Sequence, residues 1–274
     1  MTILCELFEL SRAGYYACHE AHETARSQRD QELAPLVRSI FLQHRRRYGA
    51  RRIAVELAAM GQLCGVERVA QLLKSQGLQA IQPRAYRPRT TDSRHTLGYS
   101  PNLLLSASSP VTINRVWVAD ITYIPLRTAG FAYLALVMDR FSRRVVGWQL
   151  ANHMSESLVC QALRSAIRTR QPRAGLIHHS DRGGQYAGGE YRSLMRRTEM
   201  RQSMSRARNC YDNAFMESCF GTIKTELEMT EYDDIAGARR ELASYLSYYN
   251  LERRHSSLDY LSPAAFEQLH TPPG

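Results

Sequence analysis

Hydrophobic residues recur at helical spacing after residue 30. In QELAPLVRSIFLQHRRR the apolar residues Leu33, Leu36, Val37, Ile40 and Phe41 follow the i, i+3, i+4, i+7, i+8 pattern of one helix face. Two shorter amphipathic segments follow and stop at a glycine, where helices commonly end. The pattern predicts a helix-turn-helix-like module over about residues 30–80.

Beyond residue 110 the pattern changes to β-rich runs. VWVADITYI, FAYLALVMD and VVGWQL are separated by turn residues, which predicts an antiparallel meander. A helix (about 155–170), the short strand LIHHS, a helix (189–198), a strand (201–204) and a helix from about Asp212 follow, before a last helix over about 234–249. This order predicts an α/β fold, a mixed sheet covered by helices, with an N-terminal all-α domain.

The segment between these two patterns is rich in Pro, Ser, Thr and Arg and has little periodicity, which is typical of a linker. We therefore expect three parts: a helical DNA-binding region over 1–95, a linker over 96–112, and a core with a C-terminal helix and tail over 113–274.

The chain is basic, and its charge is unevenly distributed. Lys and Arg exceed Asp and Glu by 36 − 26 = 10 among 274 residues, and Arg38 to Arg94 holds twelve basic residues against three acidic ones. A local surplus of this kind favours a nucleic-acid partner, although a basic soluble enzyme with an ordinary helical appendage has the same composition. Arg51, Arg52 and Arg68 are the candidate DNA contacts of the helical module.

Cysteine usage and hydropathy indicate a cytoplasmic protein without a membrane partner. If the protein binds DNA, we expect it to be associated with the nucleoid. The six cysteines form no CxxC pair, the N-terminus lacks the features of a signal peptide, and the apolar run near 131–138 is too short to span a bilayer.

Three acidic residues carry the candidate chemistry: Asp120 in a β-rich run, Asp181 after a short strand, and Glu217 on a predicted helix. Carboxylate oxygens are the ligands that Mg²⁺ and Mn²⁺ prefer. Each residue also has an ordinary interpretation, because a buried arginine could compensate Asp120, Asp181 could belong to a turn, and Glu217 could lie on an exposed face. Zinc is not expected at His178 and His179, which lack partners at metal-site spacing.

The helix that carries Glu217 has a polar, glycine-containing face. Asn213, Gly221 and Lys224 share the face of Glu217, and Lys224 lies two turns beyond it. Phe215, Cys219, Ile223 and Leu227 lie elsewhere around the helix and should pack inward. Lys224, Arg182 and Asn213 are therefore the candidate DNA contacts near the three acids.

These motifs resemble those of insertion-sequence transposases of the DDE superfamily, the retroviral-integrase-like type encoded by a second open reading frame, OrfB. The similarity covers about residues 30–270 and lies in YGARRI…GVERVAQLLKSQGL, WVADITY, HSDRGGQY, NCYDNAFMES and YYNLERRHSSLDYLSPAAF. It implies a ribonuclease-H-like fold on which Asp120, Asp181 and Glu217 form the catalytic triad and hold Mg²⁺ or Mn²⁺, two ions in all.

The resemblance also implies an activity and partners. We expect cleavage at the ends of an insertion sequence, 3′-hydroxyl strand transfer into target DNA, binding to terminal inverted repeats, a homo-oligomeric synaptic complex, and cooperation or fusion with the upstream OrfA protein. Two alternatives remain open: a structure-selective nuclease on the same fold, and a non-catalytic DNA-binding regulator.

Overall fold

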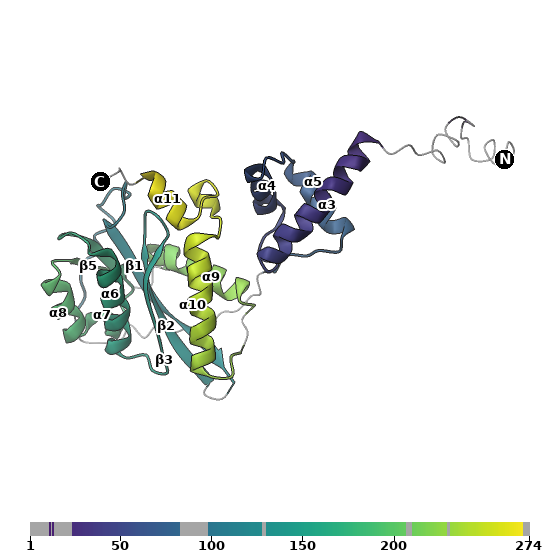
Figure 1. Ribbon diagram of the computed structural model, residues 1–274. Helices are drawn as coiled ribbons and strands as arrows, with labels where there is room; N and C mark the ends of the chain where they lie inside the picture. The colour runs from purple at the N-terminus through teal and green to yellow at the C-terminus, as the bar shows by residue number, and fades with distance from the viewer. Residues whose placement is uncertain are drawn as a thin grey trace. The chain divides into compact units, whose positions relative to one another are not determined.

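The computed structural model describes residues 11, 13, 24–82, 98–127, 130–206, 210–228 and 231–270. The chain divides into two compact units, Met1–Ile81 and Gln82–Gly274 (Figure 1). The predicted boundary between residues 95 and 96 lies outside the described residues, so the three-part division stays a prediction.

The first unit contains the three predicted helices, α3 (Ala25–Gln43), α4 (Ala50–Ala59) and α5 (Val66–Ser75). Thr24 caps α3 by accepting a hydrogen bond from the Ser27 amide at 3.1 Å. The helices share a core whose members are all less than 10% exposed: Leu33, Val37, Ile40, Phe41, Ile53, Ala54, Leu57, Val69, Leu72 and Leu73.

Both predicted glycine stops are confirmed. Gly61 follows α4 with φ +77°, and Gly77 follows α5 with φ +65°, backbone conformations that side chains with a Cβ rarely adopt. The spacing of apolar residues also places Met60 on the buried face of α4 and Val66 on that of α5. Both lie at the ends of these segments and are 55% and 39% exposed, so the buried part of each face is shorter than the spacing suggests.

The second unit is built on a five-stranded mixed sheet with the order β3-β2-β1-β4-β5. The predicted meander is confirmed: β1 (Val116–Leu126), β2 (Gly130–Asp139) and β3 (Val145–Ala151) pair antiparallel. The two short strands, β4 (Ile177–Ser180) and β5 (Arg201–Met204), continue the sheet in parallel from β1.

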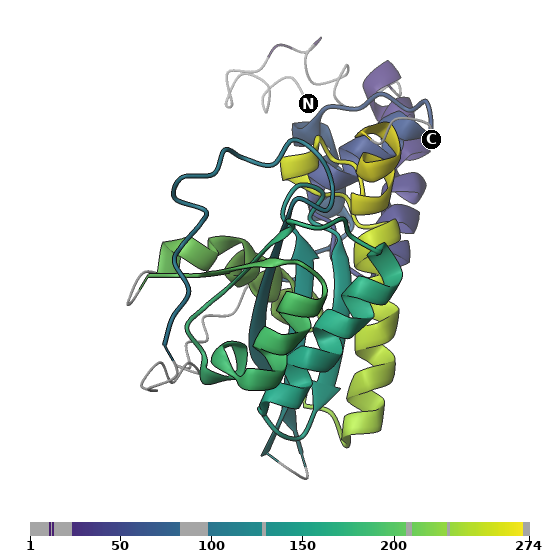
Figure 2. The same ribbon diagram turned by 90° about the vertical axis from the view of Figure 1, so that its left-hand side faces the viewer.

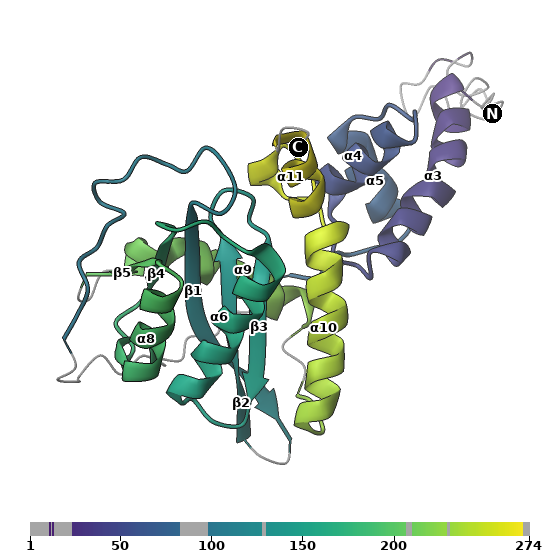
Figure 3. The same ribbon diagram turned by 60° about the vertical axis from the view of Figure 1, so that its left-hand side comes forward.

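Helices cover both faces of this sheet, as Figures 1 and 3 show. One face carries α6 (Glu156–Arg170), α7 (Gly184–Ala187) and α8 (Gly189–Arg197), which lie in front of the sheet in Figure 2. The other face carries α9 (Ala214–Glu226) and α10 (Ile235–Leu251), and α11 (Pro263–His270) packs against α10. This mixed sheet between two helical layers confirms the predicted α/β, ribonuclease-H-like class.

Alternation along β1 explains how one strand serves both faces. Trp117 and Ala119 belong to the core beneath α6, whereas Val118 belongs to the core beneath α9 and α10. Close packing is needed on the α6 side, because a Cβ on Gly147 of β3 would lie 2.4 Å from the Ala162 carbonyl oxygen.

Candidate active site

Asp120 and Asp181 lie at neighbouring positions of adjacent strands. β1 and β4 pair in parallel, with Val118 opposite His179 as the last registered pair. Two further steps in the same register bring Asp120, in the middle of β1, opposite Asp181, the first residue after β4. Ligands of α/β sheets gather at the carboxyl ends of parallel strands, and Asp181 occupies such an end.

Local hydrogen bonds orient both carboxylates. One Asp120 oxygen accepts from the Ile121 amide at 2.8 Å, and one Asp181 oxygen accepts from the Gly183 amide at 3.0 Å. The Asp181 bond closes a tight turn in which a Cβ on Gly183 would lie 3.1 Å from that oxygen and 2.8 Å from Gln185. The motif DRGG therefore forms a turn, and this turn fixes the direction of the Asp181 side chain.

Glu217 reaches the same region from α9, and Asn213 anchors the start of that helix. The predicted helix starts later than expected, because residues Cys210–Asn213 form a 3-10 turn. Asn213 is 6% exposed, and its amide nitrogen donates to the carbonyl oxygen of Ala119 at 3.3 Å. It therefore ties α9 to β1 beside Asp120, and its role as a DNA contact stays a prediction. Glu217 is exposed in the first turn of α9, where the helix dipole favours a negative charge.

Asp120 is coupled electrostatically to the other two acids. The pKa of Asp120 is raised well above its ordinary value, first by burial, then by the negative charge of Asp181 and, to a smaller extent, that of Glu217. Lys224 and the Ile121 amide act in the opposite direction. Negative charges that repel one another in a buried site favour a proton or a cation among them.

Lys224 is the positive member of this group. Its Nζ atom lies 3.9 Å from the centroid of the Tyr123 ring, a cation–π contact with a side chain of β1. Burial lowers the pKa of Lys224 to about 8, and the charge of Asp120 limits this decrease. The prediction that Lys224 lies near the acids is therefore supported by its electrostatic coupling to Asp120.

Tyr186 also belongs to this group, although the sequence analysis assigned it no role. Its side chain is 1% exposed, and none of the described residues forms a hydrogen bond with its hydroxyl. Burial raises its pKa, and the charges of Asp120 and Asp181 add to the rise. The only sequence signal was its place in the motif HSDRGGQY, five residues after Asp181.

His179 of that motif and His178 before it are bonded within the core. The His178 ring shares a 2.8 Å hydrogen bond with the Tyr191 hydroxyl, and the His179 ring bonds to Ser203 at 2.8 Å and Ser205 at 3.1 Å. Burial lowers the pKa of His178 to about 3 and that of His179 to about 4, so both rings are neutral at pH 7. These hydrogen bonds hold β4 against Tyr191, Ser203 and Ser205.

Some of the arginines proposed as DNA contacts already bind other groups of the protein. Arg182 donates to the Ser205 carbonyl oxygen at 2.7 Å and lies over the Tyr99 ring. Arg68 forms a 2.6 Å ion pair with Asp30 that joins α5 to α3, and Arg52 donates to the Arg47 carbonyl oxygen at 3.3 Å. Arg51 is exposed on α4. All four stay predictions as DNA contacts.

The side chains of Asp120, Asp181 and Glu217 suit a hard divalent cation, because they supply only oxygen ligands. The negative charges of Asp181 and Glu217 also repel that of Asp120, and a bound cation would relieve this repulsion. Among the residues with described positions, no group of three or more His, Cys, Asp or Glu side chains is already arranged to hold a metal ion. Glu217, which is exposed, is the member with room to rotate. In the described residues, no helix combines the length and apolar character required to cross a membrane.

Comparison with protein families places both units. An integrase core domain model matches residues 111–210, a second integrase core domain model matches 198–263, and an HTH-like domain model matches 28–86. The solved HTLV-2 integrase catalytic core in complex with magnesium aligns with a TM-score of 0.46 at 15% identity, over 57% of this chain and 97% of that one. Both integrase core domain models fall within the second unit.

Whole-chain relatives define the family more closely. The chain is 40% identical over 269 residues to the insertion element IS600 31 kDa protein of Shigella sonnei, covering 97% of this chain and 98% of the relative. It is 38% identical to the transposase InsF of IS3A from Escherichia coli, covering 96% and 92%, and 37% identical to the IS904 transposase of Lactococcus lactis, covering 87% and 94%. The protein belongs to the insertion-sequence transposase family.

Proposed function

We propose that this transposase cleaves DNA at the ends of an insertion sequence and joins the freed 3′-hydroxyl to target DNA, with Asp120, Asp181 and Glu217 as the catalytic triad. The observation that carries the proposal is a placement: Asp120 lies on β1, Asp181 directly follows the adjacent parallel strand β4, and the helix of Glu217 and Lys224 starts at Asn213, which bonds to Ala119 beside Asp120. The family of the chain supports the reaction class, and the arrangement of the acids supports the residues.

The three carboxylates would hold Mg²⁺ or Mn²⁺, two ions in all, with Asp120 between the other two. Such ions, when bound, activate a water or hydroxyl nucleophile and stabilise the leaving 3′-oxygen. The strand register keeps Asp120 and Asp181 together, and the bond from Asn213 to the Ala119 carbonyl keeps the start of α9 near them. No covalent protein intermediate is required, so the same site serves hydrolysis and strand transfer.

Two neighbours would assist the triad. Lys224 carries a positive charge beside Asp120 and suits contact with a phosphate of the bound strand. The hydroxyl of Tyr186 is buried without a hydrogen-bond partner among the described residues, and it would orient Asp120 or Asp181 by a hydrogen bond when the site is assembled.

The N-terminal unit would bind the terminal inverted repeats. Its HTH-like family match and its arginines support this role, with Arg51 as the exposed candidate. We further propose that the protein acts as a homo-oligomer that holds two ends in a synaptic complex, alone or with the OrfA protein.

The test is a joining assay with the purified full-length chain. A duplex that carries the terminal sequence flanking the gene, already cut to expose its 3′-hydroxyl, is incubated with a supercoiled target plasmid and Mg²⁺, with and without the OrfA protein. The proposal expects the labelled end to be joined to the plasmid by the wild type and not by Asp181→Asn. Cleavage without joining in both conditions would indicate a nuclease, and binding without either reaction would indicate a regulator.

A further inference from the structure

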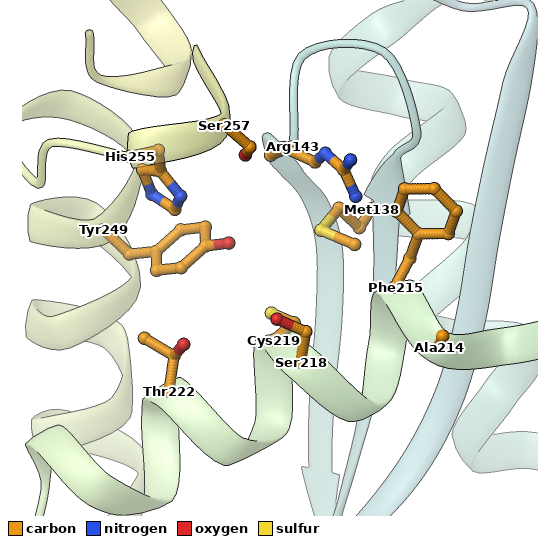
Figure 4. Close-up of a pocket in the computed structure, with 10 residues that line it drawn as sticks. All are labelled: Met138, Arg143, Ala214, Phe215, Ser218, Cys219, Thr222, Tyr249, His255 and Ser257. Carbon is orange, nitrogen blue, oxygen red and sulfur yellow. The ribbon is translucent and has the colours of Figure 1, made fainter. Parts of the chain in front are cut away.

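A second feature lies beside the carboxylates, on the α9 and α10 face of the sheet. A cavity of about 300 Å³ opens between α9, α10, the end of β2 and the segment near Ser257 (Figure 4). Arg143 and Phe215 stand on one side, and Tyr249, His255 and Ser257 on the other. We call this cavity the arginine pocket.

The positive charge of the pocket has no balancing acid within the described chain. Arg143 lies 4.0 Å from the Phe215 ring centroid, and Arg140 lies 4.9 Å from the same centroid. Among described residues, neither guanidinium has an ion pair. Arg143 lines the pocket, whereas Arg140 lies outside its lining and has a buried Nη1 atom without a hydrogen-bond partner. Burial lowers the pKa of both arginines, and the charge of Arg140 further lowers that of Arg143. Two crowded, partly buried guanidiniums favour an anion between or beside them.

The other walls supply hydrogen-bonding groups for an anion. Ser218 and Thr222 of α9 present hydroxyls one turn apart, and Ser257 presents another from the opposite wall. In Figure 4 the Tyr249 hydroxyl also points into the cavity. Arginines combined with hydroxyls suit phosphate oxygens, which accept several hydrogen bonds at once.

The pocket and Glu217 lie on neighbouring faces of the same helix. At about 100° per residue, Ser218 and Thr222 are turned roughly 100–140° from Glu217, so the two sites are about one helix diameter apart, on the order of 10–12 Å. Between them runs an exposed stripe of small residues, Ala214, Ser218 and Gly221, where a DNA backbone can approach closely.

We propose that the arginine pocket binds a phosphate of the DNA strand that crosses α9 from the carboxylates. This inference rests on the proposed function, because it assigns the pocket to the same substrate. A phosphate contact carries no sequence information, and it would fix the position of the DNA strand relative to Glu217. Arg143, which lines the pocket, would bind the phosphate, and Arg140, on the same Phe215 ring, would add positive charge nearby.

The experiment measures DNA binding by the full chain without metal, so it does not depend on cleavage. The affinity for a short labelled duplex is followed over a series of KCl concentrations for the wild type and Arg143→Gln. Each lost phosphate contact reduces the slope of log K against log salt by about 0.9. We expect Arg143→Gln to bind several-fold more weakly, with a slope smaller by about one, while Arg168→Gln, an exposed arginine on the opposite face, keeps the wild-type slope.

A second pair of variants shows whether weaker binding reflects the pocket itself or a general loss of structure. Ser256 and Ser257 are adjacent and both exposed, but only Ser257 lines the pocket. Ser257→Asp should weaken binding more than Ser256→Asp, although both add the same charge. Equal effects, or an unchanged salt slope in Arg143→Gln, would overturn the proposal.

A last arm identifies the source of the phosphate. If inorganic phosphate raises the melting temperature of the wild type but not of Arg143→Gln, while DNA affinity is the same in both, the pocket binds a small free anion and the proposal is wrong. If the wild type does not join DNA but Arg143→Gln still lowers the slope of log K against log salt, the proposed function is wrong and the phosphate contact of the pocket stands.

Discussion

Asp181 directly follows β4, the parallel neighbour of the strand β1 that carries Asp120, and its negative charge makes the ionised form of Asp120 less stable. Their juxtaposition follows from the register, which is set by the last paired residues, Val118 and His179. A site of this kind stores electrostatic repulsion in the metal-free protein and releases it when a cation binds.

Replacement of Asp120 by Asn should therefore stabilise the metal-free protein while abolishing Mg²⁺-dependent cleavage and joining. Because the folded-state pKa of Asp120 is raised above 3.8, the folded protein retains a proton that the unfolded chain has released. This contribution to stability is present below the ordinary pKa and is lost as pH rises through the folded value. We expect Asp120→Asn to melt a few degrees higher than wild type at pH 7 in EDTA.

Magnesium provides the control for this variant. Mg²⁺ should raise the melting temperature of the wild type more than that of Asp120→Asn. Without metal, the two proteins should bind DNA ends with similar affinity. An Asp120→Asn protein that still joins DNA would remove Asp120 from the triad.

Lys224 should make DNA binding sensitive to pH near 8. Its pKa is lowered to about 8, so the free protein loses this positive charge as pH rises through that value. A bound phosphate favours the charged form, so the decrease in affinity should begin at or above pH 8. Fluorescence anisotropy without metal should show the decrease in the wild type and not in Lys224→Arg, whose guanidinium stays charged.

The same residue predicts an opposite trend in stability. Between pH 8 and the ordinary lysine value of 10.5, the unfolded chain binds more protons at this position than the folded chain. The contribution of Lys224 to the free energy of unfolding therefore rises with pH in this window. Lys224→Met should lack that rise in denaturant titrations, and a variant with the wild-type rise would show that Lys224 is not desolvated.

Tyr186 and Tyr191 form a matched pair for testing an unused buried hydroxyl. Both side chains are 1% exposed, but only the Tyr191 hydroxyl has a partner, His178, in the described structure. Tyr191→Phe should destabilise the protein by about 1–3 kcal/mol, whereas Tyr186→Phe should be neutral or stabilising by about 1 kcal/mol. If the Tyr186 hydroxyl orients a catalytic carboxylate, Tyr186→Phe should also slow joining without weakening DNA binding. Normal joining rates would leave Tyr186 a packing residue.

The sequence predicted most of the elements because their patterns are local. The spacing of apolar residues locates the N-terminal helices, and alternation along β1 assigns Val118 and Trp117 to opposite faces. The start of α9 was placed too early because a 3-10 turn precedes the helix, and the hydrogen bond from Asn213 to the Ala119 carbonyl is a tertiary contact that residue spacing does not reveal. The electrostatic coupling of Tyr186 to Asp120, which lies on a distant strand, leaves no periodic signal in the sequence.

The arginine pocket could not be predicted from the sequence for the same reason. Phe215, expected to pack inward, is only partly buried because Arg140 and Arg143 lie against its ring. These arginines come from the turn between β2 and β3, more than seventy positions before Phe215 in the chain. Strand pairing and the placement of α9 bring them together, and neither is visible in residue spacing.

The C-terminal segment should depend on one buried ion pair. Arg253 and Glu226 are each 6% exposed at the side chain and lie 2.8 Å apart, and the Tyr245 hydroxyl donates to Glu226 at 3.0 Å. The charge of Glu226 raises the pKa of Arg253, while burial acts against it. Removal of one partner leaves the other charge buried, so Arg253→Met should lower the free energy of unfolding by about 3–5 kcal/mol. Arg127→Met, which breaks an exposed pair with Asp233, should change it by less than about 0.5 kcal/mol. Similar effects of the two variants in urea titrations would mean that water reaches the Arg253 pair.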